Sequence, residues 1–191
     1  MIYMAIVNIG WLVFALVWAM AAVTAKRSAR GPGWGGQVGV RVTAAVFIYL
    51  LIRAIRAGWG ASVLSTVVSA LSNPVLNVAG LVLFVAGIGL AVWARLYLGR
   101  NWGMPMSLRQ GHELVTSGPY RFVRHPIYSG ILLAVVGSIL VGEFWWLAVL
   151  PVVIVYFVYS ALTEERMMGE QFPGAYPEYM KRTKMLIPFA L

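Results

Sequence analysis

The chain of 191 residues contains no cysteine, no aspartate and only two histidines. Without cysteine there are neither disulfides nor thiolate ligands, and two histidines do not make a histidine-rich metal centre. Acidic residues are scarce as well: six glutamates stand against fifteen lysines and arginines, which gives a formal net charge of +9. The sequence therefore predicts chemistry that runs without thiols, and it predicts no metal site.

Hydrophobic residues make up 61% of the chain, and the mean hydropathy is +0.81. Soluble domains are closer to one half apolar, so this composition is typical of an integral membrane protein. The basic residues mostly lie at the ends of the apolar runs, as the positive-inside rule expects. This placement favours anionic lipid headgroups over nucleic acid as partners of the positive charge.

The apolar runs predict an all-α fold, a polytopic transmembrane helical bundle of about five spans. We place the spans at residues 2–24, 39–57, 74–97, 126–141 and 145–162, with a short surface helix before Asn73. Basic residues crowd the connections after the first and third spans, which places both in the cytoplasm, the N-terminus outside and the C-terminus inside. Within one membrane domain we distinguish an N-terminal part, residues 1–73, from a core, residues 74–191.

The fourth and fifth predicted spans are so close in sequence that they must form a short antiparallel hairpin. The hairpin is expected to bring His125-Pro126 and Glu164-Glu165 to the same membrane depth. Pro126 fixes the helix start and places His125 near the N-cap, with Tyr128 on the same face. We expect the two glutamates beside the last turn of the fifth span, where they oppose the helix dipole and need a cation or hydrogen-bond donors.

Each of these signals also has a purely structural interpretation. Arg121, Arg124 and His125 are typical of positive-inside anchors, and a glutamate pair is often solvated at a helix end. Gly87 and Gly89 in the third span are expected to allow close helix packing. The combination of the histidine and the glutamate pair favours a functional site over separate structural roles.

The C-terminal segment, residues 167–191, mixes aromatic and charged residues, which predicts a cytosolic amphipathic helical segment. Pro173, Gly174 and Pro177 predict a break in it, followed by a second short helix that runs to about Lys184. We expect this segment to pack over the site as a lid.

Four motifs between residues 74 and 189 occur in an order that resembles a known family. They are LGRNW at residues 98–102, GHELVTSGPY at 111–120, RHPIYSG at 124–130 and the pair Glu164-Glu165 with Phe172, Tyr176 and Tyr179 behind it. This pattern resembles the integral membrane methyltransferases, which include isoprenylcysteine carboxyl methyltransferase and the phospholipid N-methyltransferases.

The resemblance implies a cytosol-facing pocket for S-adenosylmethionine, closed by the C-terminal segment. The cofactor contacts that it implies are His112, Glu113, Leu114, Val115, Tyr120, His125, Pro126, Ile127, Tyr128 and Glu164. Contacts to the methyl acceptor are expected from Arg100, Asn101, Trp102 and Ser160. His125 and Glu165 are candidates for a catalytic base, and Arg124, like Arg100, for a clamp on an anionic acceptor.

One position departs from the family pattern. The prenylcysteine enzymes of eukaryotes carry an arginine four residues before the glutamate pair, where it can hold the substrate carboxylate, and this chain has Ser160 there. The acceptor is therefore left open between a carboxylate, which the resemblance favours, and a phospholipid or amine nitrogen.

The function that we predict is methyl transfer from S-adenosylmethionine to a lipophilic small molecule or lipid, in a prokaryotic inner membrane. Two other classes stay open. Sterol reductases, which bind a nicotinamide cofactor, share features of the C-terminal region but are expected to be much longer. A non-enzymatic membrane protein that retains the pocket is the third possibility.

Overall fold

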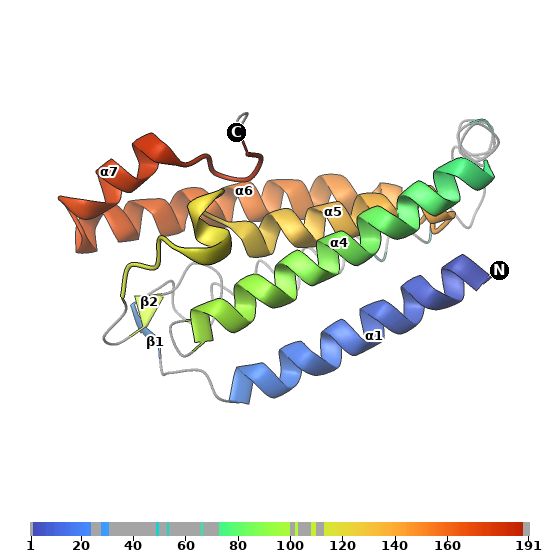
Figure 1. Cartoon of the computed structure of the whole chain (residues 1–191), viewed down its shortest axis with the longest axis horizontal. Coiled ribbons are helices and arrows are strands. Elements are labelled where there is room, and N and C mark those ends of the chain that lie inside the picture. The colour runs from blue at the N-terminus through green and yellow to red at the C-terminus, as the bar shows by residue number, and fades with distance from the viewer. Residues whose placement is uncertain are drawn as a thin grey trace.

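A computed structural model describes residues 2–23, 28–30, 49, 53, 66, 73–99, 102, 108–109 and 113–188. Its long helices are α1 (Ile2–Val23), α4 (Pro74–Leu98), α5 (Pro126–Val141) and α6 (Trp146–Gln171). They extend along the long axis of the molecule, and the shorter α7 (Ala175–Arg182) turns back from the end of α6 (Figure 1). The 3-10 helix η2 (Gly118–Arg121) precedes α5, and two short strands, β1 (Ser28–Arg30) and β2 (Leu108–Arg109), pair antiparallel.

Among the described residues, three helices are long and apolar enough to cross a membrane: Ile2–Met20 within α1, α4 and α6. The apolar helix α5 has only 16 residues. The predicted helical membrane architecture is confirmed. The predicted second span, residues 39–57, and the surface helix that follows it lie outside the described residues apart from isolated positions.

Local sequence signals explain where α4 and α5 begin and end. Asn73 caps α4, because its side-chain oxygen accepts a hydrogen bond of 2.8 Å from the backbone N–H of Val75. Pro126 occupies the first turn of α5, and Gly142, with φ of 109°, ends that helix in the left-handed conformation that glycine adopts easily. The third and fourth predicted spans consequently agree with α4 and α5 to within one residue.

The prediction for the end of the fifth span was wrong. The sequence predicts an end at residue 162, whereas α6 continues to Gln171. Glu164 and Glu165 therefore lie inside the helix and not beside its last turn. The predicted conflict between these carboxylates and the helix dipole does not arise there. The helix continues through the two glutamates because both find polar partners at or before the start of α5.

Glycines let α4 and α5 approach until their backbones touch. A Cβ atom added at Gly87 would lie 2.5 Å from the carbonyl oxygen of Gly130, and one added at Gly137 would lie 2.5 Å from that of Gly80. Real Cβ atoms do not come so close to backbone, so each of these positions requires glycine. The packing interpretation is confirmed for Gly87, whereas a Cβ atom added at Gly89 would meet no other atom of the described residues within 4 Å.

Helix α1 packs on this pair through a small apolar cluster. Val7 is fully buried against Phe84 of α4. Trp11 stacks on Trp146 with ring centroids 4.9 Å apart, and its indole N–H donates a hydrogen bond of 3.0 Å to Ser138 Oγ. Most of the remaining side chains of α1 are exposed, as expected for a helix that faces lipid.

The substitution Gly87→Ala is expected to destabilise the protein by about 1–3 kcal/mol, because the new methyl group overlaps the backbone of α5. Gly89→Ala is the matched control, since its methyl group meets none of the described residues and alanine favours a helix by up to about 1 kcal/mol over glycine. Fluorescence-detected size exclusion after heating in detergent measures both. Equal melting midpoints for the two variants would contradict backbone contact between α4 and α5.

Candidate functional site

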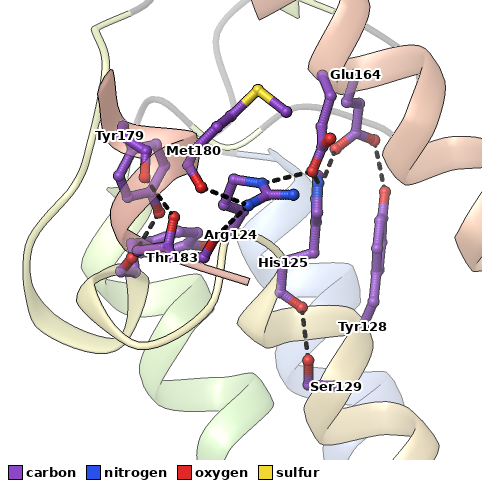
Figure 2. A network of polar contacts seen from close by, with 10 residues as sticks. Arg124, His125, Tyr128, Ser129, Glu164, Tyr179, Met180 and Thr183 are labelled. Atoms are coloured by element: carbon purple, nitrogen blue, oxygen red, sulfur yellow. Dashed lines mark hydrogen bonds and ion pairs between the residues drawn. The ribbon is translucent and has the colours of Figure 1, made fainter. Parts of the chain in front are cut away.

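Polar side chains gather where α5 begins beside α6. Arg124 and His125 immediately precede α5, Tyr128 lies in its first turn, and Glu164 and Glu165 lie on α6. His125 and Tyr128 extend side by side toward Glu164, and Arg124 lies between His125 and the residues of α7 and the segment after it (Figure 2). The predicted meeting of His125-Pro126 with the glutamate pair is confirmed.

The Glu165 carboxylate is held by a buried ion pair. Arg124 Nε donates to Glu165 Oε1 at 2.6 Å, and both side chains are only 9% exposed. His125 Nε2 lies 3.3 Å from the same oxygen, without the geometry of a hydrogen bond. A buried carboxylate is costly unless a cation and hydrogen bonds compensate it, and Arg124 supplies both.

Glu164 meets the opposite side of the imidazole. Its Oε2 lies 3.5 Å from His125 Nδ1, and its Oε1 accepts a hydrogen bond of 2.5 Å from the Tyr128 hydroxyl. The rings of His125 and Tyr128 are stacked, with centroids 5.4 Å apart, and Tyr128 stacks in turn on Phe157 of α6. The two ring nitrogens of His125 therefore face two different glutamates.

The two carboxylates change the titration of His125. Burial lowers the pKa of His125, but contacts with Glu164 and Glu165 outweigh burial and raise the pKa above its ordinary value of 6.5. Protonation gives the glutamate pair a second cation beside Arg124. Among the described residues of this cluster, two carboxylates then face two cations.

The C-terminal segment is fastened to the start of α5 by its backbone. We call residues 183–186 the strap. The backbone N–H of Arg124 donates to the Lys184 carbonyl at 2.8 Å, and the backbone N–H of His125 donates to the Met185 carbonyl at 3.1 Å. The Arg124 guanidinium donates to the Thr183 carbonyl. The predicted break after α6 and the short helix that follows it are confirmed, since α7 covers Ala175–Arg182.

Two buried tyrosines connect η2 to its neighbours. The Tyr120 hydroxyl donates to the Ala94 carbonyl of α4 at 3.3 Å, and the Tyr179 hydroxyl of α7 donates to the Tyr120 carbonyl at 2.5 Å. Burial raises the pKa of Tyr120 well above its usual range and that of Tyr179 to about 12. Both hydroxyls therefore remain protonated donors at neutral pH.

The other residues of the predicted cofactor set are distributed unevenly. Pro126 is buried at the start of α5, and Ile127 packs on the cluster around Tyr128. Leu114 and Val115 are half-buried, whereas Glu113 is exposed. His112 lies outside the described residues.

The predicted acceptor residues also fall into two groups. Arg100 and Asn101 lie outside the described residues. Trp102 is buried, with the guanidinium carbon of Arg95 at 4.3 Å from its ring centroid. Ser160 is fully buried one turn before Glu164, and none of the described residues makes a hydrogen bond with its Oγ atom.

Sequence reasoning missed Arg95 and the strap. Arg95 is 3% exposed, so it is a core residue and more than a positive charge at a helix end. Trp102, seven residues after Arg95, is the available signal, since an arginine can pack over a tryptophan ring. The strap gives no such signal, because its hydrogen bonds come from backbone carbonyls.

These features define a helical membrane protein with a buried ionic centre at the open end of a helical hairpin. Residues 75–175 match the model of the phospholipid methyltransferase family, and because the match covers more than half of the chain, the protein belongs to that family. The predicted family is thereby confirmed.

Curated relatives carry two kinds of name. The chain is 37% identical to the cobalt-zinc-cadmium resistance protein CzcN of Cupriavidus metallidurans, over 56% of this chain and 49% of the relative. It is 32% identical to protein-S-isoprenylcysteine O-methyltransferase B of Arabidopsis thaliana, over 58% of each chain. The chain thus spans about half the length of the curated relatives that it matches.

A solved structure supports the fold. The eukaryotic intramembrane Ras methyltransferase, isoprenylcysteine carboxyl methyltransferase, superposes with a TM-score of 0.56 at 24% sequence identity. The similarity covers 82% of this chain and 53% of that structure.

Stability should depend on pH through His125. The folded protein raises the pKa of His125, so protonated His125 stabilises the fold. This stabilisation is complete below about pH 6.5 and is lost as the pH rises through the higher pKa of the folded state. We expect the melting midpoint in detergent to fall across that window in the wild type and to lose this fall in His125→Gln. An equal fall in both proteins would assign the dependence to another group.

Two ion pairs of equal length should differ in their contribution to stability. Arg124→Gln leaves Glu165 buried without its cation and is expected to cost about 3–5 kcal/mol. Lys181→Gln breaks an exposed pair with Glu178, also 2.6 Å long, and should cost only about 0–1 kcal/mol. Denaturation midpoints of the two variants measure the contrast, and similar losses would show that Arg124 and Glu165 are not buried together.

Proposed function

We propose that the protein is an S-adenosylmethionine-dependent membrane methyltransferase that acts on a lipophilic acceptor. The observation that carries this proposal is the pair of the half-buried Glu164 and the buried Glu165, held by Arg124, His125 and Tyr128 within the segment that matches the family model. The names of the plant relatives, which are isoprenylcysteine O-methyltransferases, support the same reaction class.

The residues present fit such a cofactor. Glu164 and Glu165 offer carboxylate oxygens to a cation or to hydroxyl donors. His125 Nε2 and Ser160 Oγ are buried polar atoms for which no described residue provides a hydrogen bond, so each has capacity for a ligand. When bound, S-adenosylmethionine supplies a methyl group on a sulfonium that is its own leaving group.

The contribution of the chain is then to position two reactants and to exclude water. We assign Arg124 to positioning, because its guanidinium holds Glu165 and the strap together. His125 and Tyr128 orient Glu164. For an acceptor that must lose a proton, His125 and Glu165 are the proposed bases.

For the acceptor we propose a lipid or isoprenoid with a carboxylate, and an amine nitrogen as the alternative. Arg124 is engaged with Glu165 and with backbone carbonyls, which leaves Arg100 as the proposed clamp. Asn101, Trp102 and Ser160 are the other proposed acceptor residues. The hydrocarbon tail would stay in the bilayer while the head reaches the site, which avoids an extraction cost of about 0.8 kcal/mol per CH2. Other relatives are named for resistance to metals, and these names specify no methyl acceptor.

We propose that the site faces the cytoplasm of a prokaryotic inner membrane. Arg121, Arg124, Arg166, Lys181 and Lys184 all lie near the end of the bundle where α5 starts, and such an excess of basic residues marks the cytoplasmic side.

Calorimetric titration of the purified protein with S-adenosylhomocysteine tests the proposed cofactor site. We expect micromolar binding by the wild type and at least about a tenfold loss in Glu164→Gln, the size expected when a hydrogen bond to a charged group is removed. Glu178→Gln is the matched control, because that carboxylate pairs only with the exposed Lys181 among the described residues.

Absence of binding by folded wild-type protein would refute the methyltransferase proposal. Binding of a nicotinamide nucleotide in its place would support the reductase class.

A further inference from the structure

A concave site lies outside the glutamate cluster. It is a groove of about 210 Å³ between η2 and the C-terminal end of α7. Its cations are Arg121, Lys181, Arg182 and Lys184, and its apolar surface includes Phe122 and Met180. We call this the basic groove.

The basic groove gathers positive charge with little compensation. No acidic side chain is among its lining residues, and of the described acidic residues only Glu178 pairs with one of its cations, Lys181. Arg121 lies over the ring of Phe122, with its guanidinium carbon 4.6 Å from the ring centroid. Cations held this close repel one another, so a bound anion would lower the energy of the groove.

Hydrogen bonds hold the backbone around the groove in place, and a specific site requires such a fixed backbone. Val123 and Lys184 pair as a parallel bridge, and Thr183 Oγ1 donates to the Tyr179 carbonyl at 2.8 Å. Arg124 donates to the carbonyls of Met180 and Thr183 (Figure 2). The two walls of the groove are thereby joined to each other and to the start of α5.

The position of the groove points to lipid as the source of the anion. Arg121 and Phe122 lie just before Pro126, where the apolar helix α5 begins. A polar segment at the start of an apolar helix is expected at the boundary of the hydrocarbon. Phe122 is 47% exposed and Met180 39% exposed, directly beside the cations. Cations next to exposed apolar side chains are typical of surfaces that contact headgroups and the upper acyl chains together.

We propose that the basic groove binds the phosphate of an anionic phospholipid. Arg121, Arg182 and Lys184 meet the phosphate, and Phe122 and Met180 contact the glycerol and upper acyl region. The proposal rests on charge complementarity and placement, and it is independent of methyl transfer.

Native mass spectrometry of the full chain, titrated in detergent with phosphatidylglycerol or phosphatidylcholine, tests it. We expect one phosphatidylglycerol to bind in preference to phosphatidylcholine. Arg182→Gln should weaken this binding about fivefold, and Arg121→Gln/Arg182→Gln about twenty-five-fold, because each basic residue near an anionic surface contributes about a fivefold factor. Arg182→Lys, which keeps the charge, should retain most of the affinity.

Arg166→Gln is the control, since it removes an exposed charge of α6 outside the groove and should leave the affinity unchanged. Melting midpoints equal to that of the wild type verify that the variants are folded. Equal affinities for the two lipids, or a loss shared by Arg166→Gln, would overturn the proposal. Inorganic phosphate that binds the wild type as tightly as phosphatidylglycerol would assign the groove to a soluble anion and overturn it too.

Discussion

The buried ion pair between Arg124 and Glu165 is the interaction on which the functional end of this protein depends. A carboxylate at 9% exposure on a long apolar helix is unfavourable by itself, and the 2.6 Å contact with Arg124 compensates it. The same guanidinium donates to the Thr183 carbonyl of the strap. One side chain therefore joins α6, the start of α5 and the C-terminal segment, three parts of the chain that are distant in sequence. His125 and Glu164 take their positions from this arrangement, because each is a direct neighbour in sequence of one member of the pair.

Close packing of α4 and α5 gives this ionic centre a rigid base. The glycine contacts, Gly80 with Gly137 and Gly87 with Gly130, hold the two helices at backbone distance and fix how far α5 can slide along α4. Tyr120 then connects η2 to the Ala94 carbonyl of α4. The contacts between α4 and α5 thus fix the position of the two helices relative to each other. The polar residues of the site gather at the end where α5 begins.

The sequence predicted those features that depend on neighbouring residues. Pro126 marked the start of α5, and the short link after α5 required the hairpin that brings His125 to the glutamates. The prediction for the end of α6 was wrong, because Glu164 and Glu165 were interpreted as polar residues that end a span. Tertiary partners such as Arg124 and Tyr128 allow the helix to continue to Gln171. The sequence named Arg124 as a candidate clamp on an anionic acceptor, and only the folded chain shows that its guanidinium pairs with Glu165. Backbone acceptors in the strap leave no pattern in the sequence.

The central claim is that this ionic centre forms the cofactor site of a membrane methyltransferase, and photo-crosslinking tests its location most directly. Ultraviolet irradiation of the purified protein with S-adenosylmethionine labelled in its methyl group, followed by peptide mapping, would identify the chain segments in contact with the cofactor. The account predicts adducts in peptides that contain residues 120–128 or 160–165, suppressed by excess S-adenosylhomocysteine. Label that maps to α1, or that excess S-adenosylhomocysteine does not suppress, would contradict it.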